Sequence, residues 1–222
     1  MLLSKLVFLC VKNVIYLNDT SFNYPGFCSG DFDNNIDYVT NINNVFSPLN
    51  EAIARLQDLD KIPYVVEEIA PSEDRTIDLS LLEKQPRQII GVAVVDTYGN
   101  YRKLAFTMFG KDKIRIKSPY SSFETKIYVE FKEEIETFSK LDILPLEEDG
   151  TDNNIDLFKK YGIDEAMSNY IMEYVQGKLL EPIAPELANM HITRSESYFN
   201  NLRTAIKSFP QSRVELLYTM DD

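Results

Sequence analysis

The sequence predicts an α+β protein in which a helical bundle carries an inserted antiparallel β-meander or sandwich. Apolar residues recur every three or four positions near both ends of the 222-residue chain, a spacing typical of amphipathic helices. Between residues 63 and 138 apolar and polar residues alternate, which is typical of strands. We therefore expect a helical domain of residues 1–61 and 142–209, a β-domain of residues 62–141 and a C-terminal docking tail at residues 210–222.

The first predicted helix lies within residues 1–17, MLLSKLVFLCVKNVIYL. Lys5 and Lys12 interrupt its short apolar run, and no small-residue cleavage site follows. The run is also too short to cross a bilayer. We interpret the segment as an amphipathic helix that packs on the body, in preference to a signal peptide or a membrane contact.

A long loop is expected at residues 18–44, because the segment is rich in Asn, Asp, Gly and Pro. The next helix is predicted to begin near Ser47, with Pro48 in its first turn, and to end by Asp60.

The chain has two cysteines, Cys10 and Cys28. The helix-like setting of Cys10 favours a small buried thiol, although pairing of the two stays open. Two cysteines without histidine partners make no metal site, and their small number indicates a reducing compartment.

Six strands are predicted in the middle of the chain: Tyr64–Ile69, Arg75–Leu79, Gln88–Asp96, Tyr101–Phe109, Lys113–Lys117 and Thr125–Phe138. The segments Tyr98–Asn100 and Phe109–Asp112 are tight-turn sequences, so consecutive strands are expected to pair as hairpins. The run Ile89–Val95 is apolar on both faces and should be central. The last two strands alternate more strictly and should bury one face.

Three helices are predicted between Asp152 and Phe209. Asp152 is the expected cap of the first, and Gly162 lies where a glycine ends a helix. The second helix has an apolar stripe of Ile163, Ala166, Met167, Tyr170, Ile171, Tyr174 and Val175. The stripe of the third comprises Leu187, Ala188, His191, Ser195, Tyr198, Phe199, Leu202, Ala205, Ile206 and Phe209.

The net charge of −12 argues against broad affinity for nucleic acid. The charge is unevenly spread along the chain. Residues 1–83 hold 5 basic and 13 acidic residues, residues 84–132 hold 10 and 4, and residues 133–222 hold 8 and 18. Such segregation is compatible with an evenly solvated surface or with complementary patches for head-to-tail association of copies.

No catalytic or metal-binding constellation is predicted, and no cofactor. His191 lies on an apolar stripe without partners at ligand spacing, so a packed histidine is favoured. Asp149, Asp152 and Asp156 do not have the spacing of a calcium loop and are interpreted as a solvated linker with a helix cap. Gly110-Lys111 lacks the glycine spacing of a phosphate loop.

Four basic residues are candidates for a subunit interface. Lys113, Arg115 and Lys117 are predicted to project from one strand face, with Lys126 and Lys132 joining them. Three interpretations stay open: the solvent-exposed face of a sheet that buries its other face, docking to an acidic neighbouring subunit, and contact with passing nucleic acid. We take Lys113, Arg115, Lys117 and Lys126 as the interface candidates.

The C-terminal tail is apolar enough to favour a partner. Its candidate partner-binding residues are Arg213, Val214, Leu216, Leu217 and Tyr218. The tail would bury its apolar side chains by adding a strand to the sheet of another chain. The alternative is that it folds back on its own domain.

Several short motifs occur in a consistent order: Leu49–Ala52, then the strand Lys126–Phe131, then Leu144–Leu146, then the helix Ala166–Leu180, and last Phe199–Leu202. Together with the order of the elements, they resemble the head–tail connector (adaptor) proteins of tailed bacteriophages, including the tail tubular proteins of short-tailed phages. The resemblance covers most of residues 1–209.

The resemblance implies a structural virion protein of the neck or tail, assembled in the host cytoplasm and without enzymatic activity. Its copies, commonly twelve, would form a homo-oligomeric ring beneath the portal protein, which residues Pro210–Asp222 would contact. A downstream tail protein and the passing genomic DNA, bound without sequence specificity, are the other implied partners; a membrane is not.

Two further classes stay open from the residues alone. One is another phage tail or neck component, such as a tube or nozzle protein, or a carbohydrate-binding β-module. The other is an enzyme, for example a virion cell-wall hydrolase that uses Glu130 or Glu134.

Overall fold

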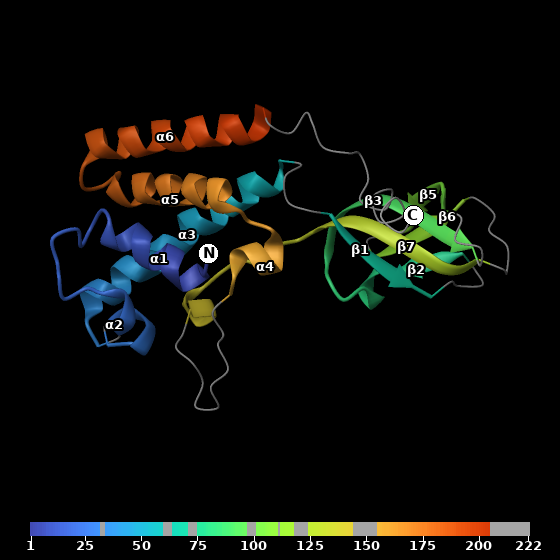
Figure 1. Cartoon of the computed structure of the whole chain (residues 1–222), viewed down its shortest axis with the longest axis horizontal. Helices are drawn as coiled ribbons and strands as arrows, with labels where there is room; N and C mark the ends of the chain where they lie inside the picture. Colours follow the sequence, from blue (N-terminus) through green and yellow to red (C-terminus); the bar gives the residue numbers. More distant parts are fainter. Residues whose placement is uncertain are drawn as a thin grey trace, which may run out of the picture. The chain divides into compact units, whose positions relative to one another are not determined.

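The computed structural model describes residues 1–31, 34–59, 64–70, 75–96, 101–110, 112–117, 124–143 and 155–204. It confirms the predicted α+β class. The described residues of Met1–Ile62 and Ile135–Lys207 form a helical unit, and those of Pro63–Glu134 form a β unit (Figure 1). Residues 135–141, expected in the β-domain, belong to the helical unit, because Ile135 and Phe138 are buried in its core.

The helical unit draws its elements from both ends of the chain. They are α1 (Leu3–Lys12), α2 (Tyr24–Ser29), α3 (Ile36–Gln57), η2 (Lys140–Ile143), α4 (Leu157–Tyr161), α5 (Glu165–Leu180) and α6 (Pro185–Thr204). Helix α5 packs against α1 and α3 on one side and against α6 on the other (Figure 1). The predicted pairing of N-terminal and C-terminal helices around one core is thus confirmed.

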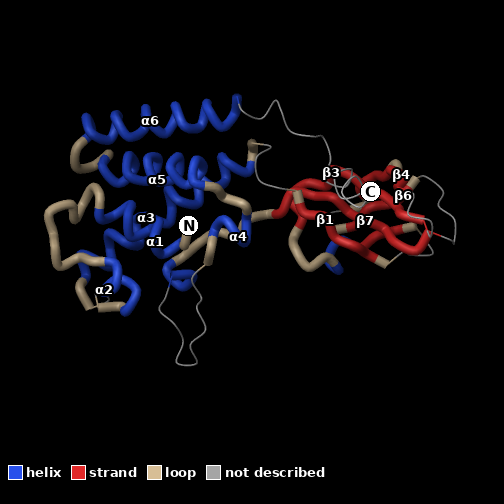
Figure 2. The backbone as a smooth tube through the Cα atoms, in the orientation of Figure 1, coloured by secondary structure: helices blue, strands red, loops and turns tan. Residues whose placement is uncertain are grey.

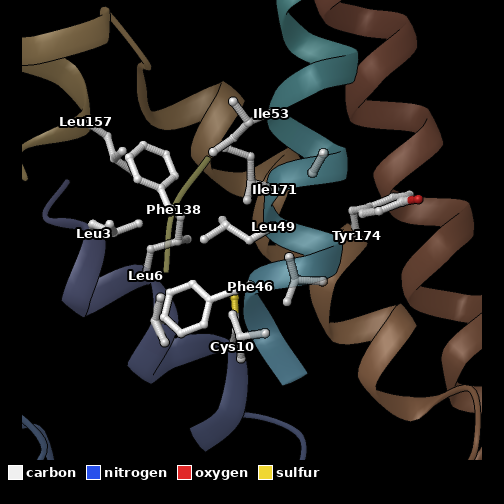
Figure 3. Packing of buried hydrophobic residues seen from close by; sticks show 14 of the residues in the cluster. Leu3, Leu6, Cys10, Phe46, Leu49, Ile53, Phe138, Leu157, Ile171 and Tyr174 are labelled. Carbon is white, nitrogen blue, oxygen red and sulfur yellow. The ribbon is translucent and has the colours of Figure 1, made fainter. Parts of the chain in front are cut away.

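The core of the helical unit joins segments that are far apart in the sequence (Figure 3). Its fully buried side chains include Leu3 and Leu6 of α1, Leu49 of α3 and Ile171 of α5. Cys10 also faces this core, and burial raises the pKa of its thiol. Both cysteines are free, so Cys10 and Cys28 are not paired.

The expectation of a long loop at residues 18–44 is wrong, because the segment contains α2 and the first part of α3. Asn23 caps α2 by accepting a hydrogen bond from the Gly26 amide at 2.9 Å, and Asn35 caps α3 in the same way. The next helix therefore does not begin at Ser47. Pro48 lies inside α3, at the cost of one backbone hydrogen bond.

Aromatic packing explains why so polar a segment is ordered. Six rings, drawn from α1, α2, the start of α3 and the connection between α1 and α2, stack or meet edge to face with centroids 4.7 to 6.4 Å apart. They are Phe8, Tyr16, Phe22, Tyr24, Phe27 and Tyr38. The rings supply the burial that the surrounding Asn and Asp residues cannot.

Caps define the ends of the C-terminal helices. Asp152, the predicted cap of α4, lies outside the described residues, and Asp156 performs this role by accepting from the Phe158 and Lys159 amides. Gly162 ends α4 with a φ of 69°, as predicted. Asp164 then caps α5, accepting from the Met167 amide at 2.8 Å.

A narrow seam joins α5 to α6. The buried residues of α6 are Ala188, Ser195 and Leu202, which recur every seven residues. Gly177 of α5 faces Ile192 so closely that a Cβ at position 177 would lie 2.7 Å from Ile192 Cδ1 and 3.2 Å from its backbone nitrogen. The absence of a side chain at residue 177 therefore sets how closely the two helices approach.

Arg55 connects α3 to both C-terminal helices. Its guanidinium donates to Glu196 of α6 at 2.8 Å and lies 4.7 Å from the centroid of the Phe199 ring. The rings of Tyr170 and Tyr174 are also within 6 Å of it. Among the described residues, the buried Tyr170 hydroxyl has no hydrogen-bond partner. Arg55 therefore fixes α6 against the rest of the unit by a charge-assisted and a cation–π contact.

The β unit is a pair of antiparallel sheets and not a simple meander. Its strands are β1 (Val65–Ile69), β2 (Thr76–Asp78), β3 (Pro86–Asp96), β4 (Tyr101–Lys103), β5 (Phe106–Met108), β6 (Lys113–Ile116) and β7 (Glu124–Glu133), with the short helix η1 (Leu79–Leu81) after β2. One sheet has the order β1-β7-β3-β4 and the other the order β2-β6-β5 (Figure 2). Both contribute side chains to one apolar core, including Val94, Ile114 and Val129.

Strand β3 lies in the interior of its sheet with Val92 to Val95 all buried, as predicted. Two other strand expectations are wrong. The predicted strand Tyr101–Phe109 is split between the two sheets as β4 and β5, with the buried Leu104 between them. Strand β7 ends at Glu133 and buries Glu130 on its second face, where Gly91 of β3 leaves room for it. The turn at residues 98–100 lies outside the described residues.

We expect Gly177→Ala to destabilise the protein. Alanine favours a helix over glycine by about 1 kcal/mol, but overpacking at a tight contact costs about 1–3 kcal/mol. Urea unfolding of the full chain measures the net effect. Adding Ile192→Ala should recover part of the loss, because it removes the nearest side-chain atoms. A Gly177→Ala variant more stable than the parent would contradict the close helix contact.

Candidate interaction surfaces

The sole histidine packs between two helices, as predicted. His191 Nδ1 of α6 lies 2.7 Å from a carboxylate oxygen of Glu173 on α5, and both side chains are mostly buried. Among the residues that the structure describes, no group of three or more His, Cys, Asp or Glu side chains is arranged to hold a metal ion. The exposed surfaces of the two units offer the other candidate sites.

The three-stranded sheet presents a basic outer face. Lys113, Arg115 and Lys117 are exposed, while Ile114 and Ile116 between them point into the core. The structure thus brings three of the four interface candidates together on one strand and its continuation. We call these three residues the basic face of β6.

Weak contacts hold the cations of this face. Lys113 lies 3.4 Å from Asp78 of β2, and the Arg115 guanidinium lies 5.7 Å from the centroid of the exposed Phe109 ring. The pKa of Asp78 is lowered, first by hydrogen bonds from Ser80 and then by Lys113. Exposed ion pairs contribute only about 0–1 kcal/mol. A partner carboxylate could therefore compete for these cations at little cost.

Lys126 does not belong to this face, which corrects the prediction. It lies on β7 in the four-stranded sheet, where its ammonium is 3.0 Å from Glu68 of β1. The hydrogen bond to Glu68 raises the pKa of Lys126, and the Tyr128 hydroxyl donates to the same carboxylate. Lys132, also on β7, is half-buried. Alternation along the chain showed that these residues point outward, but it could not show which sheet each strand joins.

An apolar stripe on α6 was not predicted as a surface. Leu187, Met190 and Tyr198 are exposed, although Leu187 and Tyr198 were expected on the buried face. The spacing of three, four and four residues through Arg194 places the four side chains along one line of the helix. The sequence held one signal of this second face. Tyr198 and Phe199 are adjacent, and adjacent residues of a helix point in directions about 100° apart, so one narrow contact line cannot bury both. We call Leu187, Met190, Arg194 and Tyr198 the α6 stripe.

A second mixed surface lies at the start of α3. Leu17 and Ile36 are exposed there, beside Asp19 and Asp37. The Tyr38 hydroxyl donates to Asp19 at 2.6 Å, which ties the α1–α2 connection to the first turn of α3. We call Leu17, Asp19, Ile36 and Asp37 the α3 start.

Hydrogen bonds keep Asp19 ionised. Ser21 donates to it through both its hydroxyl and its amide, and the Phe22 amide adds a third contact. These bonds, with the Ser21 hydroxyl first and the Tyr38 hydroxyl next, lower the pKa of Asp19 to about 2. Asp19 therefore carries a negative charge at neutral pH.

Several predicted sites lie outside the described residues. They include the whole C-terminal tail with Arg213, Val214, Leu216, Leu217 and Tyr218, and the acidic positions Asp149 and Asp152. The enzyme candidates are both described: Glu130 is buried in the β unit, and Glu134 is exposed just after β7. In the described part of the chain, no helix has the length and apolar character needed to cross a bilayer.

No family model matches the chain, and a search of curated proteins found no significant relative.

We expect the carboxyl group of Asp19 to titrate near pH 2 in the folded protein. Its folded pKa lies below the ordinary 3.8, so its hydrogen bonds stabilise the fold above that pH and lose this effect as the pH falls to about 2. Tyr38→Phe removes one donor and should raise the pKa of Asp19. NMR titration of the carboxyl carbon measures both values.

The matched control for this titration is Tyr24→Phe. It removes a hydroxyl from the same aromatic cluster, but one that bonds Ser4 at 2.7 Å. The pKa of Asp19 should stay near its parent value in this variant. Titration of Asp19 at its ordinary value in the parent protein would show that these bonds are not formed.

Proposed function

We propose that this protein is a structural subunit of a tailed-bacteriophage virion, a head–tail connector whose copies form a ring beneath the portal. The observation that supports this most is the layout: one helical unit built from both ends of the chain, with an antiparallel β unit inserted between α3 and η2. This is the layout implied by the resemblance to connector proteins.

Charge segregation supports self-association. The basic face of β6 belongs to residues 84–132, which hold 10 basic and 4 acidic residues, whereas the flanking parts of the chain are acidic. In a head-to-tail ring every subunit offers two different surfaces to its neighbours, so opposite charges on one chain can meet between copies. In this proposal the basic face of β6 docks on an acidic surface of the adjacent subunit.

Net charge suits a wall along which DNA passes. Strong phosphate binding requires clustered cations, and each neutralised phosphate adds to affinity. A chain of net charge −12 repels DNA over most of its surface, so a ring of such chains would guide the genome without holding it. Contact with DNA in this role needs no sequence-specific groove reading.

Native mass spectrometry of the purified full chain tests the proposal. A closed ring, with twelve copies as the expected number, supports it, and electron microscopy of the same sample should show annular particles. Addition of the portal protein encoded by the same genome should give a stable portal–ring complex. A chain that stays monomeric at all concentrations and never binds portal rings would contradict the proposal.

Reversal of the charge on the basic face of β6 should weaken assembly. The variant Lys113→Glu/Arg115→Glu/Lys117→Glu places three carboxylates opposite an acidic neighbour, and like charges in contact are unfavourable. The fraction of ring in native mass spectra should fall at least tenfold at a fixed protein concentration.

A matched control changes the net charge equally at exposed positions of the helical unit. Lys159→Glu/Lys160→Glu/Arg203→Glu provides it. If this control weakens the ring as much as the β6 variant does, overall charge and not the basic face governs assembly. Unchanged ring formation by the β6 variant would remove these residues from the interface.

A further inference from the structure

We infer that the α6 stripe of one copy docks on the α3 start of a second copy, as a head-to-tail contact between helical units. The inference rests on the proposed ring and names a contact within it. It concerns surfaces of the helical unit and is independent of the basic face of β6.

The α6 stripe has the character of an interface without its partner. Leu187 is 51% exposed, and Met190 and Tyr198 are each 39% exposed, on a helix that packs mainly on α5. The seam of Ala188, Ser195 and Leu202 is turned by about 90° around the helix from the stripe, so the stripe lies beside the centre of the α5 contact. Large apolar side chains in one line, with one arginine among them, match the composition of interface cores.

The α3 start is complementary in composition and sign. Ile36 is 80% exposed and Leu17 is 66% exposed, and both sit beside carboxylates. Asp19 is held ionised by its hydrogen bonds, and Asp37 is exposed in the first turn of α3. Arg194 in the middle of the α6 stripe would meet these carboxylates while the apolar side chains on both surfaces leave water.

The α3 start is also rigid enough to receive a helix. The Tyr16 and Tyr38 rings lie 4.7 Å apart, and Asn41 donates to the Tyr16 hydroxyl at 2.7 Å. With the Asp19–Tyr38 hydrogen bond, these contacts hold Tyr16 and Asp19, the residues that flank the segment with Leu17, against the start of α3. A preformed surface binds with a smaller loss of conformational entropy than a flexible one.

Both surfaces belong to one compact unit, which decides how they can meet. Helix α6 packs mainly on α5, and α3 reaches it through Arg55, close to the C-terminal end of α3. The first turn of α3 lies 19 residues before Arg55, about 28 Å along the helix, and close to α2 (Figure 1). The stripe therefore cannot reach the α3 start of its own copy. A contact between two different surfaces of identical subunits is heterologous, and such contacts build rings when the rotation closes.

A two-fold pairing of two α6 stripes fits the charges less well. Arg194 lies near the middle of the stripe, so an antiparallel pair of stripes would bring two arginines together. Like charges at the centre of an interface disfavour it, whereas the α3 start offers two carboxylates. The sign of the charge thus selects the head-to-tail contact.

Disulfide trapping between two variants tests the contact. In a Cys28→Ser background, which leaves only the buried Cys10, Leu187→Cys and Ile36→Cys are purified separately, mixed and mildly oxidised. A covalent dimer in the mixture, and none in either variant alone, is expected. The matched control replaces Leu187→Cys by Asn189→Cys, an exposed position on the opposite side of α6, and should give no dimer.

Other outcomes overturn the contact. A dimer of Leu187→Cys with itself shows two-fold pairing of α6, and equal trapping by Asn189→Cys shows random collision. Native mass spectra of the same background separate this inference from the proposed function. If rings form but no dimer is trapped, the contact is wrong and the ring proposal stands. If a dimer is trapped but no rings form, the contact stands and the ring proposal is wrong. If neither rings nor the dimer form, both are wrong.

Charge exchange provides a second readout in the full chain. Arg194→Glu should raise the dissociation constant of self-association about tenfold. Adding Asp37→Arg in the same chain should restore most of the lost affinity. Analytical ultracentrifugation measures both. Equal affinity of Arg194→Glu and the parent, or no recovery in the double variant, would remove the Arg194–Asp37 pairing.

Discussion

Helices near both ends of the described chain pack into one hydrophobic core, and the rest of the molecule is arranged around that constraint. The Leu3 amide donates to the Ile155 carbonyl at 2.8 Å, and the Leu157 amide donates to the Met1 carbonyl at 3.0 Å. The N-terminal segment therefore pairs with the start of the C-terminal helices before α1 enters the core. Because α1, α3 and α5 must pack together, the strands between α3 and η2 can only form a separate unit with its own core.

The same constraint leaves surfaces for other molecules. Helix α5 is buried on several sides, so it has little surface to offer, whereas α6 covers it with one narrow seam and keeps an apolar line exposed. In the β unit, strand β6 buries two isoleucines and presents two cations, and Lys117 just after the strand adds a third. The residues that hold the fold together and those that we propose to contact other copies thus lie on different faces of the same elements.

Periodicity predicted much of this fold, because each long element buries a face that the sequence marks. It found the helices at both ends and β3 as an interior strand, and the preference for glycine after a helix found the end at Gly162. It failed at α2, a helix too short to show a period, and at Pro48, which tertiary packing tolerates inside α3. Strand pairing is a non-local property, so the sheet that receives Lys126 could not be read from alternation. The exposure of Leu187 and Tyr198 depends on how narrow the contact with α5 is, which is set by Gly177 and small residues of the partner helix.

We propose that copies of this chain form the ring beneath a phage portal. Electron cryo-microscopy of the full chain incubated with the portal protein of the same genome decides whether they do. A ring of density on the tail-facing side of the portal is expected, with helical units in contact around it. Portal particles that stay bare at saturating concentrations of the chain would show that the protein is not this ring.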